Sequence, residues 1–204
     1  MDGEQPAAKL SDRGTATKNA LLAAARDVFI QSGFAQANVT DVVARAGASV
    51  GSLYHHFNGK ADLFTTLFDD FQLRQQERTS TAIRGTRDTG EGDPLELFVA
   101  GARAYLEGCF AERDLVRIFR NGDGPPGFDL VARRRLREWA RRNAALLSAR
   151  GEGPYDDAIV LIVTSTMAGL VNEVALSDDE QRARDLSEEV LDLMGKLGYL
   201  RSLP

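Results

Sequence analysis

The sequence predicts an all-α protein of about nine helices, and three observations lead to this prediction. Apolar residues recur at three- and four-residue spacing over most of the chain, which is the period of amphipathic helices. Glycine, proline and asparagine interrupt this pattern at a few separated points, which mark helix ends. No run alternates β-branched or aromatic residues with polar ones between turns, so no strand is predicted.

The first helix is expected over about 15–32, where leucine, valine and phenylalanine fall at helical spacing. Gly33 then supplies the stop, since glycine adopts the left-handed backbone conformation at helix ends. The polar residues 1–14 precede this pattern and are expected to form a flexible N-terminal arm.

Two short helices should follow, from Asn38 to Ala46 and from Ser49 to Phe57. The side chains of Asn38 and Ser49 are expected to cap the free backbone N–H groups at the two helix starts. Gly47 lies between the helices and can take the conformation of a sharp turn. Asn58-Gly59 ends the second of them.

The remaining residues predict six longer helices separated by glycine- and proline-containing breaks. Their expected ranges are 60–83, 94–111, 112–120, 128–149, 155–176 and 178–197. Asp93 is expected to cap the helix at 94–111, and Pro94 is favoured in the first turn of a helix. We therefore expect an N-terminal domain at 15–59 and a helical C-terminal domain at 60–204.

Composition points to a soluble globular protein whose default address is the cytoplasm. The single cysteine, Cys109, has no intrachain partner and is expected to be a small buried hydrophobic group. The N-terminus does not resemble a signal peptide. The most apolar run, Ala158–Val171, is too short to cross a bilayer, so no membrane association is expected.

Net charge does not by itself favour a nucleic-acid partner, because the formal total is −5. Residues 1–60 carry six Lys and Arg against five Asp and Glu, so the acidic excess lies in the rest of the chain. This division is compatible with DNA binding at the N-terminal end, since only the contact face must be positive.

The two short helices have the proportions of a helix-turn-helix unit. Apolar residues such as Val42 and Leu53 can pack the two helices together. The outer face of the second helix carries short or polar groups that fit a major groove, namely Ser49, Gly51, Ser52, Tyr54 and His55. Gly51 costs helix stability, about 1 kcal/mol relative to alanine, so we expect a close approach to its backbone.

The stretch from Asn38 to Phe64 resembles the DNA-binding signature of TetR-type (tetracycline-repressor-like) regulators. The residues that carry the resemblance are Ala46-Gly47, Ser49, Gly51, Leu53-Tyr54, His56-Phe57, Lys60 and Leu63-Phe64. The resemblance covers roughly 17–68, about a quarter of the chain. One departure is Val43, where the family usually has alanine.

This resemblance implies a role for each matching position. Asn38 and Ser49 would present helix N-termini to phosphates. Tyr54, His56 and Lys60 would hold the DNA backbone. The residues that would face base edges are Thr40, Val50, Gly51, Ser52 and His55. Double-stranded operator DNA is then the expected partner, with no cofactor.

The resemblance also implies a homodimer and a small-molecule effector bound by the C-terminal domain. Ala158–Val171 is apolar around nearly its whole circumference, which independently favours a second copy as its cover. The family's dimers pair the last two long helices, here 155–176 and 178–197. A largely apolar effector is expected, and its candidate contacts, which are alternatively core residues, are Phe98, Tyr105, Cys109, Phe119, Trp139 and Met167.

Two further patterns have plain alternatives. His55 and His56 are adjacent, and neighbouring positions on a helix point about 100° apart, so no metal site is expected. The arginine-rich stretch 133–142 is either a second nucleic-acid patch or, as we prefer, the solvent face of an amphipathic helix.

Taken together, these residues favour a ligand-responsive repressor that is not an enzyme, since no nucleophile with a plausible base occurs in the C-terminal domain. One alternative is a helical carrier or enzyme that keeps a vestigial helix-turn-helix. Another is an activator, or a regulator that answers to a protein partner.

Overall fold

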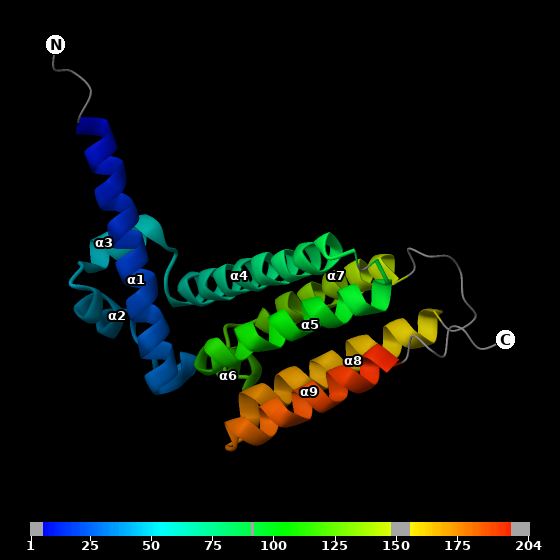
Figure 1. Ribbon diagram of the computed structural model, residues 1–204. Helices are drawn as coiled ribbons and strands as arrows, with labels where there is room; N and C mark the ends of the chain where they lie inside the picture. Colours follow the sequence, from blue (N-terminus) through cyan, green and yellow to red (C-terminus); the bar gives the residue numbers. More distant parts are fainter. Residues whose placement is uncertain (1–5, 91, 148–155, 197–204) are drawn as a thin grey trace, which may run out of the picture.

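The computed structural model describes residues 6–90, 92–147 and 156–196, and this part of the chain contains nine α-helices and no strand. Figure 1 shows α1–α3 as a head at one end and α4–α9 as an elongated body. The bounds are α1 Pro6–Gln36, α2 Val39–Ala46, α3 Val50–His56, α4 Lys60–Asp88, α5 Pro94–Ala111, α6 Arg113–Arg120, α7 Phe128–Leu147, α8 Asp156–Leu176 and α9 Glu180–Lys196. The predicted all-α fold class is thus confirmed.

Helix α1 begins earlier than the sequence pattern predicted. We expected an arm over 1–14, whereas the helix starts at Pro6. Proline is favoured in the first turn of a helix, and the alanines and leucine that follow it are good helix formers. The first five residues of the expected arm lie outside the described residues. Gly33 breaks the helix as predicted, with φ 75° and ψ 169°, and the chain turns there before Ala37.

The body helices follow the predicted order with shifted ends. Helix α4 continues to Asp88, five residues beyond the prediction, because Gly85 is tolerated inside a helix flanked by arginines. Helix α5 begins as predicted, with the Asp93 carboxylate accepting hydrogen bonds from Leu95 N (2.9 Å) and Glu96 N (3.3 Å). The expected helix ends at 149, 155 and 197 lie outside the described residues.

The apolar core forms two clusters, and the one in the head extends into the body. The head cluster is built on Leu21, Phe29 and Leu53, all nearly inaccessible to solvent. Residues of α4, α6 and α7 complete it, so the head does not close its own core. The predicted domain boundary after residue 59 stays a prediction.

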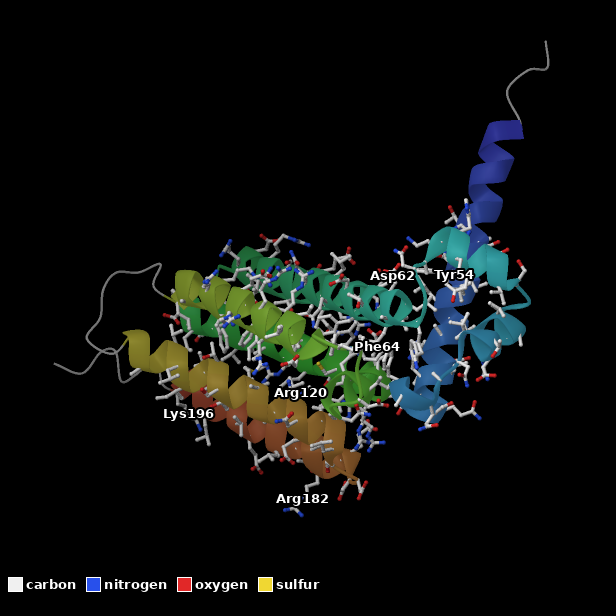
Figure 2. All side chains as sticks on the ribbon, turned by 180° about the vertical axis from the view of Figure 1, so that it is seen from behind. Tyr54, Asp62, Phe64, Arg120, Arg182 and Lys196 are labelled. Atoms are coloured by element: carbon white, nitrogen blue, oxygen red, sulfur yellow. The ribbon has the colours of Figure 1, made fainter. Side chains whose placement is uncertain are left out.

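Four phenylalanines join the head to the body. Phe64 and Phe68 of α4 meet Phe119 of α6 and Phe128 of α7, and we call these residues the phenylalanine cluster. The ring centroids of Phe64 and Phe128 are 4.9 Å apart, and those of Phe68 and Phe119 are 5.2 Å apart, both edge-to-face. Figure 2 shows Phe64 at this junction. The head is thereby held to α4, α6 and α7 together.

Among the described helices, none combines the length and the hydrophobicity that a membrane span requires.

Candidate DNA-binding face and body cavity

Helices α2 and α3 form the predicted helix-turn-helix unit. Gly47 has φ 61° and ψ 30°, the left-handed conformation that the turn requires. Its N–H donates to Ala44 O (3.3 Å), which closes the end of α2. Val43, the departure from the family pattern, is buried in the head core together with Leu53. The larger side chain is therefore accommodated inside the unit.

The start of α3 is capped as predicted. Ser52 N donates to Ser49 Oγ at 3.1 Å, and the two hydroxyl oxygens are 3.0 Å apart. One backbone N–H of the first turn is thus satisfied by the protein, and the remaining free N–H groups are available to an anion.

The side-chain cap predicted for the start of α2 is wrong, because Asn38 makes no capping hydrogen bond. Asn38 has the extended backbone of a cap residue, but its side chain makes no capping bond. Instead Asn38 Nδ2 donates to Gln36 O at 3.2 Å and lies 3.5 Å from Asp41 Oδ2. The nearby carbonyl and carboxylate compete successfully for the amide, so the side chain is turned away from the N–H groups of α2.

The residues expected to meet DNA lie on the surface of the head. Val50 is 44% exposed and Tyr54 is 59% exposed, so two large side chains of α3 lack cover within the chain. Asn38, Thr40, Ser49, Gly51 and His55 are also exposed, while Ser52, His56 and Lys60 are half-buried. Which of these ten residues touch DNA stays a prediction.

Gly51 is not required by packing inside the chain. A Cβ atom at this position would lie 3.8 Å from Ser49 Oγ, which is ordinary contact. The glycine therefore leaves the backbone of α3 open from outside, and a close approach of DNA to it stays a prediction.

Lys60 is committed to the head, which the sequence did not indicate. Its Nζ donates to Phe34 O at 2.7 Å and to Ala35 O at 3.2 Å, and lies 4.5 Å from the centre of the Phe34 ring. The ammonium group thus satisfies carbonyls just after the Gly33 break.

The two histidines make an edge-to-face pair with ring centroids 4.9 Å apart. Among the described residues, no group of three or more His, Cys, Asp or Glu side chains is arranged to hold a metal ion.

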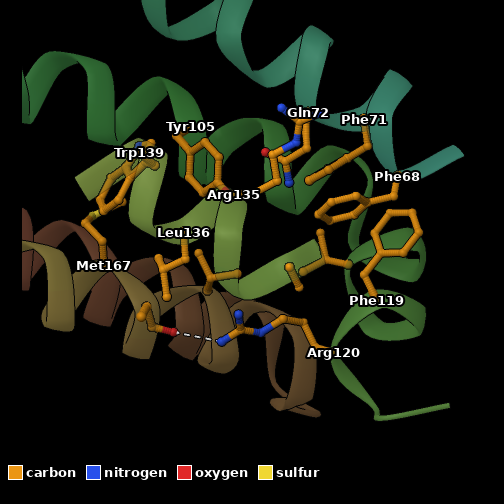
Figure 3. A pocket seen from close by; sticks show the side chains of 14 residues that line it. Phe68, Phe71, Gln72, Tyr105, Phe119, Arg120, Arg135, Leu136, Trp139 and Met167 are labelled. Atoms are coloured by element: carbon orange, nitrogen blue, oxygen red, sulfur yellow. Dashed lines mark hydrogen bonds between the residues drawn. The ribbon is translucent and has the colours of Figure 1, made fainter. Parts of the chain in front are cut away.

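The body contains a cavity of about 120 Å³, which we call the aromatic chamber. Its described lining residues are Phe68, Phe71, Gln72, Tyr105, Val116, Phe119, Arg120, Ala132, Arg135, Leu136, Trp139, Met167, Ala168 and Val171. Figure 3 shows Trp139 and Met167 on one side and Phe68 and Phe119 on the other.

A second cavity of about 250 Å³, the polar chamber, adjoins the first and shares Gln72, Tyr105 and Trp139 with it. It is lined by Gln72, Gln75, Gln76, Thr79, Ser80, Ile83, Tyr105, Trp139, Arg142 and Asn143. Helices α4, α5 and α7 therefore contribute to both chambers.

The structure separates the six ligand-contact candidates. Tyr105, Phe119, Trp139 and Met167 line the aromatic chamber, whereas Phe98 borders a cavity of only about 20 Å³. Cys109 is fully buried and lines none of these cavities. Whether any of the six binds a ligand stays a prediction.

Sequence reasoning missed both Phe71 and the arginines of the aromatic chamber, Arg120 and Arg135. Arg135 belongs to the arginine-rich stretch, and its side chain, which is 41% exposed, both reaches solvent and lines the chamber. Leu136, on the same helix, also lines the chamber although its side chain is 44% exposed. A helix-periodicity plot of α7 that included the arginines could have indicated their two different faces.

Burial suppresses ionisation deep in the body. It raises the pKa of the Cys109 thiol to about 12. It also raises the pKa of the Tyr105 hydroxyl, and the neighbouring Cys109 raises that pKa further. Both groups are therefore protonated at neutral pH.

Helix α6 connects the chamber to the other parts of the molecule. Arg113 Nε donates to Val174 O (2.7 Å) and Arg117 Nε to Ala175 O (2.6 Å), so α6 satisfies carbonyls at the end of α8. After α6, the Asp123 carboxylate accepts a hydrogen bond from Ala35 N at 2.9 Å and 3.2 Å to its two oxygens. One short helix thus reaches α8, the chamber and the head.

Helices α8 and α9 lie side by side along one edge of the body (Figure 1) and expose large apolar side chains. Leu161 is 67% exposed, Leu176 63% and Leu193 61%. These are the helices predicted to pair in a dimer.

Comparison with known proteins supports the resemblance seen in the sequence. A family model described as "Bacterial regulatory proteins, tetR family" matches residues 21–67. The HTH-type transcriptional repressor BepR of Brucella suis is 34% identical over 91 residues, which are 45% of this chain and 42% of that protein. The match thus spans less than half the length of this curated relative.

Solved structures match over nearly the whole chain. A transcriptional regulator from Rhodococcus sp. RHA1 is 25% identical with a TM-score of 0.69, covering 88% of this chain and 94% of that one. A TetR-like transcriptional regulator from the same organism shares the fold at 20% identity with a TM-score of 0.68, covering 90% and 96%. The tetR family model thus matches the N-terminal part of the chain, residues 21–67, and the fold is similar to that of solved transcriptional regulators.

Proposed function

We propose that this protein is a ligand-responsive transcriptional repressor that binds a palindromic operator as a homodimer. The observation that carries the proposal is the outer face of α3. Val50 and Tyr54 are exposed there beside the capped helix start at Ser49, on a unit whose buried side is fully packed. Such a face suits the major groove, where a recognition helix inserts its N-terminal half.

The contacts divide into two classes. The start of α3 and the side chains of Tyr54 and His56 contact phosphates, which supply affinity without reading sequence. Base edges are read by the short or polar groups of the face, namely the exposed Thr40, Val50, Gly51 and His55 and the half-buried Ser52.

A dimer is supported by the exposed leucines of α8 and α9, which would pair with the same helices of a second copy. Two heads joined in this way would place their α3 helices in successive major grooves about 34–36 Å apart.

An effector in the chambers would act on the spacing of the heads. Helix α6 lines the aromatic chamber through Phe119 and Arg120, and the connection that follows it holds the head through Asp123. A ligand that binds better when the heads are misplaced weakens operator binding by the same factor by which DNA weakens ligand binding.

The proposal includes no catalytic activity. The relatives and structural neighbours that the chain resembles are described as transcriptional regulators. We place the protein in the cytoplasm, where it meets its DNA.

The test is selection of genomic fragments by the purified protein at about 150 mM salt, which suppresses non-specific binding. We expect enrichment of one palindrome, and at least a tenfold loss of its affinity in Tyr54→Ala. Leu73→Ala is the matched control, because Leu73 is equally exposed at 59% but lies on α4 outside the face. It should bind as the native protein does.

Two results would contradict the proposal. One is folded dimeric protein that enriches no sequence, which would leave a carrier with a vestigial head. The other is equal loss of binding in both variants, which would place the DNA contact elsewhere.

A further inference from the structure

The chambers of the body have a charge opposite to that of the chain as a whole. The protein has a formal net charge of −5, yet three arginines, Arg120, Arg135 and Arg142, line the two chambers. No Asp or Glu occurs among the described residues that line them. Among the described residues that line the chambers, the charged side chains are thus all arginines, and two of them, Arg120 and Arg142, are exposed to solvent.

We propose that the effector is a small organic anion, an aromatic carboxylate with a body of about one ring. This inference rests on the proposed function, since it names the ligand class of the same cavity. Its supporting observations are the unneutralised charge of Arg120, the buried donors of α7 and the size and walls of the aromatic chamber.

The hydrogen-bond partners of Arg120, which is an exposed residue, are neutral groups. Its Nε donates to Asn172 Oδ1 at 2.8 Å, and its Nη2 contacts the same oxygen and donates to Ala168 O at 3.2 Å. No carboxylate among the described residues forms a salt bridge with it. Arg135 differs, because it is paired with Asp69 at 2.9 Å and Glu138 at 3.4 Å. Arg120 is therefore the cation that an anionic ligand would neutralise.

Hydrogen bonds to α8 also hold Arg120 in position. A guanidinium group offers five N–H donors in a planar fork that matches a carboxylate. Figure 3 shows Arg120 at the lower edge of the chamber, with Phe68 and Phe119 on one side of it and Trp139 on the other. A ligand would thus meet a positioned cation at one edge and apolar walls along its body.

Two buried donors of α7 point to the same ligand chemistry. Arg135 Nε lies at the aromatic chamber and Asn143 Nδ2 at the polar chamber, and neither atom has a hydrogen-bond partner. At the polar chamber, the buried acceptor Gln75 Oε1 also lacks a partner. Buried donors without partners are costly, so a ligand that supplies acceptors is favoured. A carboxylate accepts hydrogen bonds and donates none.

The size of the aromatic chamber sets the size of the ligand body. Its volume of about 120 Å³ is close to that of an engineered apolar cavity in another protein, about 150 Å³, which binds benzene. Phe68, Phe71 and Phe119 offer ring edges and faces to an aromatic guest. One ring fits this space better than a fused or branched system.

The experiment compares benzoate, benzamide and benzamidine, which share a ring and nearly a shape but are negative, neutral and positive at neutral pH. Each is titrated into the full chain without DNA. The readout is the emission of Trp139, the only tryptophan in the sequence and a lining residue of both chambers. We expect benzoate to bind at least about tenfold more tightly than benzamide, and benzamidine most weakly.

Variants then locate the preference. Arg120→Gln should bring the ratio of benzamide to benzoate dissociation constants close to one, whereas Arg120→Lys should preserve part of it. Arg137→Gln is the matched control, since Arg137 is exposed on α7 and lines neither chamber. It should behave like the native protein, and circular dichroism should show that each variant is folded.

Equal or tighter binding of benzamide or benzamidine by the native protein would overturn the proposal, and so would failure of all three probes at millimolar concentration. These outcomes do not depend on any variant folding. Persistence of the benzoate preference in folded Arg120→Gln would overturn the role of Arg120.

The binding assay contains no DNA, so its result is separate from that of the repressor proposal. Benzoate binding with no effect on operator affinity would refute ligand responsiveness while preserving the charge preference. Operator binding with no benzoate preference would refute the anionic effector while preserving the proposed DNA binding.

Discussion

The ammonium group of Lys60 shows how one side chain can serve the fold where the sequence suggested only DNA. Because it donates to two carbonyls and sits over the Phe34 ring, Lys60→Met should lower the free energy of unfolding by about 1–2 kcal/mol. Urea unfolding followed by circular dichroism measures this change.

A second lysine of the head provides the control for Lys60. Lys18 Nζ lies 6.0 Å from the centre of the Phe57 ring and is exposed, so Lys18→Met should change stability by less than about 0.5 kcal/mol. An unchanged urea midpoint in Lys60→Met, with weakened operator binding, would assign Lys60 to DNA alone.

The Cys109 thiol should be inert in the folded protein. Burial raises its pKa from about 9 to about 12, and a thiol reacts only as thiolate. Iodoacetamide at pH 8 should therefore label the protein in urea but not in buffer, as measured by mass spectrometry. Rapid labelling under native conditions would show that the site opens.

The same shift makes the protein sensitive to alkaline pH. The unfolded chain loses the thiol proton above about pH 9, whereas the folded chain retains it up to about pH 12, so the unfolded state binds fewer protons in this window. Stability should thus be constant with respect to Cys109 below pH 8 and fall as pH rises above 9. The raised pKa of Tyr105 acts in the same direction.

At the scale of elements, the α6–α7 connection holds α1 through a single carboxylate. Asp123 accepts the hydrogen bond of Ala35 N just after the break at Gly33. Asp123→Ala should cost about 1–2 kcal/mol of unfolding free energy, since the bond is charge-assisted. The amide of Ala35 should also exchange its hydrogen faster, which NMR can follow.

A nearby acid in the first turn of α7 tests whether this effect is specific. Asp129 is exposed and pairs only along its own helix, with Arg133, so Asp129→Ala should change stability by less than about 0.5 kcal/mol. Equal effects of the two substitutions would indicate a general loss of negative charge and not a lost clamp on α1.

Elements with local signals were predictable, and elements set by distant contacts were not. Asp93-Pro94 and Ser49 mark helix starts with atoms only two or three residues away, and both are found where the sequence places them. Asn38 was misjudged because its amide finds better acceptors nearby. The beginning of α1 was misjudged because polarity alone does not exclude a helix.

The candidate site divides in the same way. The face of α3 could be predicted because its residues are close in sequence and their spacing sets which side they occupy. The chambers could not, since Phe71, Arg120 and Met167 come together only through the packing of three helices. Asn172, more than fifty residues away, orients Arg120 by a hydrogen bond. A single sequence gives no sign of this contact.

For the whole molecule, the exposed leucines of α8 and α9 predict how the protein assembles. Leu193→Glu should raise the dimer dissociation constant by about two orders of magnitude, because a carboxylate would have to be buried in the interface. Operator affinity should fall as the dimer dissociates, since each head would then bind its half-site alone. Sedimentation equilibrium measures the first effect and DNA titration the second.

An exposed leucine elsewhere controls for the introduced charge. Leu73 is 59% exposed on α4, close to the 61% of Leu193, so Leu73→Glu should leave the dimer intact. Dissociation by Leu73→Glu together with an intact Leu193→Glu dimer would place the interface on another face of the body.

The phenylalanine cluster limits how freely this head could be exchanged for that of a relative. A chimera joined after residue 59 would separate the head from Phe64 and Phe68, which close its core together with Phe119 and Phe128. A workable junction has to lie further along α4, and the new body must supply matching aromatic residues from α6 and α7. To change operator preference without changing the effector, it is therefore easier to substitute single residues on the surface of α3 than to exchange the whole head.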